Sequence, residues 1–252
     1  MIDPRVSVIN RRLAKVKRII AVSSGKGGVG KSMVATTLAL TLKNHGCKVG
    51  LFDLDFTSPS THVILNAQVT VPQEDKGIVP PLVNGLEYMS LVYFVGENPA
   101  PLRGADVSNA LIELLAVTQW GSLDFLVIDM PPGIGDVILD LLRLISRVEF
   151  LIVTTSSLLA FETVKKQVTL LCELKAHVIG VLENMKQTSS CNIEAETKKI
   201  GLHFLAEISF DSTVEDAIGD EAKLLETSIG RTLKRVVEED ILVKGCRDFG
   251  AD

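Results

Sequence analysis

Aromatic side chains are scarce in this chain of 252 residues, where they make up 5% of the sequence and include one tryptophan. Hydrophobic residues still account for 46% of the chain, so the core must be built from valine, isoleucine, leucine and alanine. Aliphatic runs that alternate with helical stretches are typical of a parallel sheet covered on both faces. The length suits one large domain with a substantial core.

Cysteine is also sparse. The four cysteines are scattered along the chain without the close pairing of a metal motif: Cys47, Cys172, Cys191 and Cys246. Their number and spacing argue against a disulfide framework and indicate reduced thiols.

An excess of positive charge and long apolar runs are missing as well. The formal net charge is −5, which argues against a protein whose main task is to coat nucleic acid or an anionic membrane. The apolar runs are too short for a membrane span, and residues 1–18 lack the apolar segment of a signal peptide. The sequence therefore predicts a cytoplasmic protein with no nucleic-acid or membrane partner.

Strand-like and helix-like segments alternate along the chain. Residues 1–17 are predicted as a basic lead-in helix, and residues 66–103, rich in proline and glycine, as an irregular excursion with a short strand near 86–92. Strands are predicted at 19–22, 49–52, 125–128, 150–153, 178–182 and 204–208, with helices between several of them. This alternation predicts an α/β fold with a doubly wound, mostly parallel sheet and helices on both faces. Residues 1–252 are expected to form a single domain.

A glycine-rich loop follows the first predicted strand and opens a helix. It consists of Gly25, Lys26, Gly27, Gly28, Val29, Gly30, Lys31 and Ser32, which matches the P-loop pattern in the context that the pattern requires. Glycines let backbone amides converge on phosphate oxygens, and the helix N-terminus adds a positive dipole. Lys31 is expected to reach the β- and γ-phosphates, and the Ser32 hydroxyl to ligate Mg²⁺.

A second lysine in the loop, Lys26, is not needed by an ordinary P-loop. With it, the loop resembles the deviant Walker A motif of the MinD/ParA class of ATPases. The resemblance implies a P-loop NTPase fold in which Lys26 crosses a two-fold interface to the partner's nucleotide, so that hydrolysis depends on an ATP-dependent homodimer. The residues alone leave open that Lys26 is a solvated loop lysine.

Asp53 and Asp55 follow the strand predicted at 49–52, and both carboxylates are expected at the edge of the sheet where the phosphates bind. In the MinD/ParA class the corresponding pair belongs to switch I. The resemblance implies that Asp55 positions the attacking water and that Asp53 supports the Mg²⁺ shell. The sequence alone leaves a capping or turn role open for one of the two.

The aliphatic strand 125–128 ends at Asp129, a pattern typical of a Walker B carboxylate that holds the Mg²⁺ shell. Two prolines and Gly133 follow, and the Gly133 amide is expected to approach the γ-phosphate as part of switch II. The predicted catalytic residues are thus Lys26, Lys31, Asp55 and Asp129. The predicted Mg²⁺ shell comprises Ser32, Asp53 and Asp129.

Longer stretches resemble the Mrp family of this class. They include Asp53-x-Asp55-x-x-x-Pro59-Ser60, Arg103-Gly104, Trp120-Gly121-x-Leu123-Asp124, the run from Ile128 to Asp136, and Glu183-Asn184-Met185. Together they cover most of residues 18–215. The resemblance implies that Asn184 hydrogen-bonds adenine, and the sequence contains no Asn-Lys-x-Asp guanine signature, so ATP is favoured over GTP.

Mrp proteins bridge an iron–sulfur cluster between two chains through a Cys-x-x-Cys pair shortly after the Asn-Met pair. This chain has only Cys191 there, with Glu194 where the second cysteine falls. Two chains would supply two thiolates, whereas a [4Fe–4S] cluster or tetrahedral zinc takes four ligands. Cluster carriage therefore depends on whether Glu194 completes the site, and Cys191 could instead be a plain helix-start cysteine.

This chain also resembles the branch of the Mrp family that lacks the Cys-x-x-Cys pair. The start Met1 to Val6 and the segment Asp55 to Leu65 are similar to the archaeal Mrp/MinD-type hydrogenase maturation ATPase (HypB type). That resemblance implies that metal is handled through a metal-chaperone partner or a metalloenzyme client, rather than on the chain itself.

The sequence therefore predicts a Mg-ATP-hydrolysing ATPase of metallocentre assembly, acting in hydrogenase maturation through such a partner or in iron–sulfur cluster transfer. The alternatives are a MinD-like positioning ATPase and a ParA-like DNA segregation ATPase. Acidic residues in the last predicted helix oppose membrane binding, and the net charge opposes DNA binding.

Overall fold

The computed structural model describes residues 4–96, 104–187 and 192–243. Its centre is an eight-stranded sheet in the order β3-β4-β2-β5-β1-β6-β7-β8. The strands are β1 (Val16–Ser23), β2 (Val49–Asp53), β3 (Leu82–Val83), β4 (Leu86–Ser90), β5 (Leu123–Asp129), β6 (Val148–Thr154), β7 (His177–Lys186) and β8 (Phe204–Ser209). Every pair of neighbours is parallel except the short β3–β4 hairpin.

The central strands are aliphatic because both of their faces are covered. Ile19 to Val22 in β1 are completely buried, and Ala21 stands opposite Ile128 of β5 on one side and Phe150 of β6 on the other. A parallel sheet needs long crossovers between neighbouring strands, and these crossovers are the helices that cover it.

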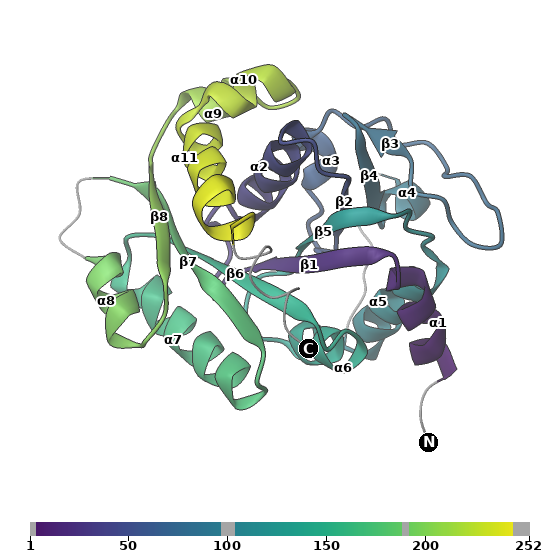
Figure 1. Cartoon of the computed structure of the whole chain (residues 1–252), viewed down its shortest axis with the longest axis horizontal. Coiled ribbons are helices and arrows are strands. Elements are labelled where there is room, and N and C mark those ends of the chain that lie inside the picture. Colours follow the sequence, from purple (N-terminus) through teal and green to yellow (C-terminus); the bar gives the residue numbers. More distant parts are fainter. Residues whose placement is uncertain (1–3, 97–103, 188–191, 244–252) are drawn as a thin grey trace.

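Helices lie on both faces of the sheet (Figure 1). One face carries α2 (Lys31–Asn44), α3 (Thr61–Ile64), α9 (Thr213–Asp216), α10 (Glu221–Glu226) and α11 (Ser228–Val236). The other face carries α1 (Pro4–Leu13), α5 (Ala105–Val117), α6 (Asp136–Leu144), α7 (Leu158–Glu173) and α8 (Ile193–Lys199). A π-helical turn, η1 (Val237–Ile241), continues α11, and α4 (Val92–Val95) follows β4. The predicted doubly wound, mostly parallel α/β sheet is confirmed.

The predicted boundaries differ from the structure at several places, and β7 continues to Lys186, beyond the predicted end at 182. The lead-in helix ends at Leu13, and Val16, which the sequence pattern assigns to that helix, opens β1 and pairs with Leu123. Spacing along the chain cannot distinguish an apolar helix position from the first residue of a strand, whereas pairing with β5 decides it. The excursion at 66–103 contains β3, β4 and α4 as far as residue 96, and residues 97–103 lie outside the described chain. None of the described helices is long and apolar enough to cross a membrane.

Three neighbouring strands are joined by an ionic cluster at their amino ends. The Arg18 guanidinium of β1 donates to both Glu149 oxygens of β6, at 2.8 and 2.9 Å, and His177 of β7 lies 3.2 Å from the same carboxylate. Burial by itself would raise the pKa of Glu149, but hydrogen bonds from His177 and Arg18, and their charges, outweigh it and lower the pKa to about 2. The cluster thus favours the ionised carboxylate.

Glu149→Gln is expected to lower the free energy of unfolding at pH 7 by about 1 kcal/mol, a modest value because solvent screens the cluster. A depressed carboxyl pKa stabilises the fold above the usual value of 4.5, and this contribution is lost as the pH falls toward 2. Urea unfolding of both proteins at pH 7 and pH 3 measures the difference, which should shrink at pH 3. A difference that stays constant with pH would contradict the ionic origin, and Glu162→Gln on the surface of α7 serves as the control.

Candidate nucleotide site

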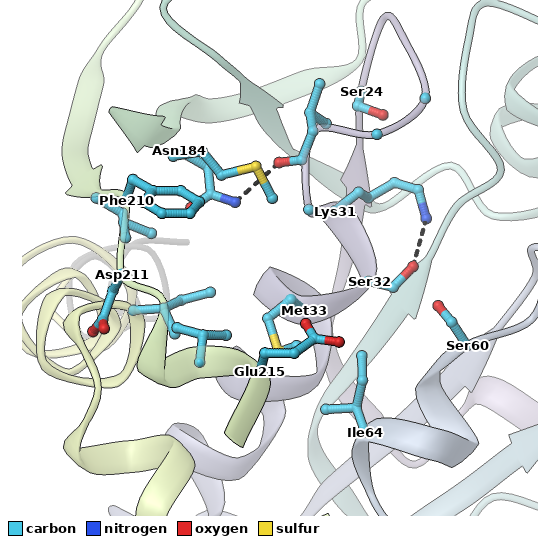
Figure 2. Close-up of a pocket in the computed structure, with 18 of the residues that line it drawn as sticks. Ser24, Lys31, Ser32, Met33, Ser60, Ile64, Asn184, Phe210, Asp211 and Glu215 are labelled. Carbon is cyan, nitrogen blue, oxygen red and sulfur yellow. Dashed lines mark hydrogen bonds between the residues drawn. The ribbon is translucent and has the colours of Figure 1, made fainter. Parts of the chain in front are cut away.

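The P-loop connects β1 to α2 at the carboxyl edge of the sheet (Figure 2). Gly28 and Gly30 both have a φ of +77°, a backbone conformation that residues with a Cβ rarely adopt. A Cβ on Gly25 would lie 2.4 Å from Thr163 Oγ1 of α7. The sequence needs glycine at these positions because the loop is both left-handed and packed closely against α7.

Lys31 is buried at the start of α2, and its ammonium group points toward two carboxylates, Asp129 at the end of β5 and Asp55 just after β2. Its Nζ lies 2.5 Å from Asp129 Oδ1 and 3.9 Å from Asp55 Oδ2, and it donates to Ser32 Oγ at 3.3 Å. The structure therefore brings together four of the predicted site residues, from the segment after β2, the end of β5 and the P-loop. Figure 2 shows the Lys31–Ser32 contact beside the open cavity.

Asp129 has the properties of a Mg²⁺-shell carboxylate. It is fully buried, and its Oδ2 has no hydrogen-bond partner among the described residues. Burial raises the pKa of Asp129, although Lys31 opposes this shift. A buried, unpaired carboxylate oxygen next to a serine hydroxyl fits the oxygen ligands that Mg²⁺ prefers.

Asp53 is also buried, but both of its oxygens are already used. Oδ2 accepts a hydrogen bond from Thr61 Oγ1 at 2.5 Å, and Oδ1 accepts one from the Asp55 amide at 3.0 Å. Burial and the charge of Asp129 raise the pKa of Asp53 to about 7. Through these two hydrogen bonds Asp53 connects the two ends of the segment 55–61. Its role in the Mg²⁺ shell stays a prediction.

Lys26 is exposed in the loop and lines the mouth of the same cavity. Within the described parts of the chain its ammonium group makes no ion pair, whereas Lys31 makes two. The backbone carbonyl of Lys26 accepts a hydrogen bond from Ser24 Oγ at 3.0 Å, which orders the loop but not the lysine side chain. The cation is therefore available to an anion outside this chain.

Gly133 follows the Walker B strand in a left-handed conformation, with a φ of +92°. Its amide donates to the Ser24 carbonyl at 2.8 Å, so this N–H is engaged with the P-loop. Its predicted contact with the γ-phosphate would require this hydrogen bond to break.

The cavity, of about 560 Å³, extends from the P-loop to the end of β8. Asn184, at the end of β7, donates from Nδ2 to the Val29 carbonyl of the P-loop at 2.9 Å and thus borders the cavity (Figure 2). Opposite the phosphate end, the cavity is lined by apolar side chains that include Met185, Phe210 and Val214. The apolar lining of this end suits a purine base.

Sequence reasoning missed Phe210 and Asp211, which directly follow β8. Asp211 Oδ1 accepts from the Thr213 hydroxyl at 2.6 Å, and Oδ2 accepts from the Ser228 amide at 2.9 Å. These hydrogen bonds, that from the Thr213 hydroxyl first, lower the pKa of Asp211 to about 2. Asp211 thereby ties the end of β8 to the start of α11. The strand-end rule that identified Asp129 would have found this segment if it had been applied to the last strand.

Phe210→Ala is expected to weaken ATP binding about tenfold, because Phe210 offers an exposed ring at the apolar end of the cavity on which a base can stack. Titration calorimetry with ATP measures the change. Phe94→Ala removes an exposed aromatic outside the cavity and should leave the affinity unchanged. An unaltered affinity in Phe210→Ala would place the base elsewhere.

The glycine loop, the buried lysine–carboxylate cluster and the parallel sheet together define a P-loop nucleotide hydrolase. A solved nucleotide-binding protein of Archaeoglobus fulgidus, in complex with ADP, matches the structure with a TM-score of 0.73 and 29% identity over 98% of this chain and 97% of that one.

The family follows from the sequence match. Residues 15–239 match the model described as NUBPL iron-transfer P-loop NTPase, of the ParA type, and the chain belongs to this family. The iron–sulfur cluster carrier protein of Methanocaldococcus jannaschii is 33% identical over 91% of this chain and 86% of its own length. The iron–sulfur cluster carrier protein of Pseudomonas fragi is 44% identical over 69% of this chain. The matched part spans 62% of the length of that relative. The predicted Mrp and MinD/ParA resemblance is confirmed.

Proposed function

We propose that this chain binds and hydrolyses Mg-ATP and uses the nucleotide state to assemble a metallocentre, working in the cytoplasm. The observation that carries the proposal is the buried Lys31–Asp129–Asp55 cluster in a chain that matches an iron-transfer NTPase family over residues 15–239. The names of the relatives favour an iron–sulfur cargo over nickel. They also favour metallocentre assembly over MinD-like positioning and ParA-like DNA segregation.

The lysine–carboxylate contact suggests how the triphosphate is received. Lys31 moves from Asp129 to the β- and γ-phosphate oxygens, which exchanges one anionic partner for another. Asp129, no longer paired with Lys31, and Ser32 would hold the Mg²⁺ shell, and the bound ion would supply neutralisation of the phosphate charge. Asp55, 3.9 Å from Lys31 at the same edge, orients the attacking water.

Lys26 serves the nucleotide of a second copy. A loop lysine that is exposed and has no anionic partner in the described chain can reach a triphosphate held across a two-fold axis. The positive charge of Lys26 would stabilise the transition state most, because negative charge develops there on the phosphate oxygens. Hydrolysis therefore requires the ATP-dependent homodimer.

This chain and a partner protein share the ligands of the iron–sulfur cargo. Cys191 lies outside the described residues, and Glu194, in the first turn of α8, is half exposed and paired with Lys198 at 2.6 Å. Two copies of the chain would offer one cysteine each at this position, which is fewer than the four ligands of a [4Fe–4S] cluster. The remaining ligands come from a client or a chaperone.

Anaerobic reconstitution of the purified chain with iron and sulfide tests this division. We expect less than one cluster per dimer, and little change in absorbance in Cys191→Ala. One stable cluster per dimer that is lost in Cys191→Ala, but kept in Cys172→Ala, would show that the chain holds the cluster by itself.

A further inference from the structure

The strand that carries Asn184 is irregular at the nucleotide cavity. The pairing of β7 with β8 shifts register between Glu183 and Lys186, so Asn184 and Met185 form a bulge. Met185 has a φ of +55°, a left-handed conformation that is rare for a side chain of its size. Such backbone strain persists only where the surroundings hold it.

The bulge packs directly on the P-loop. Asn184 Nδ2 donates to the Val29 carbonyl, and a Cβ on Gly30 would lie 2.4 Å from that nitrogen and 3.0 Å from Met185 Cε. Asn184 and Met185 therefore pack against the P-loop where both segments line the cavity.

Glu183 and Lys186 flank the bulge along β7 and belong to one polar network. Glu183 is completely buried, accepts a hydrogen bond from Ser156 Oγ at 2.7 Å, and lies 3.5 Å from Lys186 Nζ through its second oxygen. Lys186 also pairs with Glu207 of β8, and its carbonyl accepts from the Phe210 amide at 2.9 Å. The pair Glu183–Lys186 thus closes the neck of the bulge and ties the ends of three strands.

We propose that Glu183 and Lys186 are positioning residues that hold the Asn184–Met185 bulge in place for the nucleotide base. The inference rests on the proposed ATPase function. The pair Glu183–Lys186 fixes the base end of the cavity, and the P-loop fixes the phosphate end. This division gives a reason for a buried carboxylate beside the strained Met185. The pair then governs recognition of the base without contacting the phosphates.

A ligand without a base separates this role from general stability. In Glu183→Gln, which keeps the volume and a partner for Ser156, we expect the Kd and KM for Mg-ATP to rise about five- to tenfold. The kcat and the Kd for Mg-tripolyphosphate, which has no base, should change less than about twofold. Lys186→Met should reproduce this pattern, Lys186→Arg should restore most of the affinity, and the double variant Glu183→Gln/Lys186→Met should not add the two losses.

Glu162→Gln, which removes an exposed carboxylate from α7, is the matched control and should behave like the parent. Equal losses for Mg-ATP and Mg-tripolyphosphate in Glu183→Gln would overturn the proposal, because they would indicate a general structural role. Unchanged ATP binding would overturn it too. If the parent protein itself failed to bind Mg-ATP, the proposed ATPase function would fall, and this inference with it.

Discussion

Lys26→Ala is expected to reduce ATP hydrolysis about a thousandfold while leaving the Kd for ATP within about twofold of the parent. Lys26 makes no ion pair in the described chain, and Lys31 already provides the buried cation of the phosphate site. In the proposed homodimer, the lost charge is the one that would act on the nucleotide of the second copy. Phosphate release measures hydrolysis, and size-exclusion chromatography with light scattering, in ADP and in a non-hydrolysable ATP analogue, measures the dimer.

The control is Lys166→Ala, which removes an exposed lysine from α7. The dimer formed with the ATP analogue should disappear in Lys26→Ala and persist in Lys166→Ala. A Lys26→Ala protein that can no longer bind ATP would contradict the role in trans, because the lysine would then serve its own nucleotide.

Lys31→Met is expected to abolish measurable ATP binding and also to destabilise the nucleotide-free protein by about 3 kcal/mol. The second effect arises because Asp129 is fully buried and Lys31, at 2.5 Å, is the cation that compensates it. Removal of one partner leaves an unpaired charge in the interior. Chemical unfolding without nucleotide measures the loss.

The double variant Lys31→Met/Asp129→Asn provides the comparison. Neutralising both partners should recover most of the lost stability, but neither ATP binding nor hydrolysis. If the double variant were as unstable as Lys31→Met, the instability would come from packing of the side chain rather than from the buried charge.

Much of the site was predictable because its parts are local in sequence. The order strand, glycine loop and helix identifies the phosphate end, and carboxylates placed directly after strands identify Asp55 and Asp129. Parallel strands bring their carboxyl ends to one edge, so such residues meet whatever the details of packing. At the base end only Asn184 was predicted. The strand-end rule also points to the segment with Phe210 and Asp211, but that this segment lines the nucleotide cavity comes from the tertiary structure.

The sequence by itself determined the α/β class, the phosphate loop and the spare lysine, since glycine spacing and aliphatic runs act over a few residues. Only the tertiary structure decided the pairings. Lys31 contacts Asp129 across 98 residues, and Asn184 contacts Val29 across 155. These contacts follow from the strand order, in which β1 lies between β5 and β6, and from the bulge in β7. The physical reason is that buried charges and strained backbone are stable only where distant segments supply their partners.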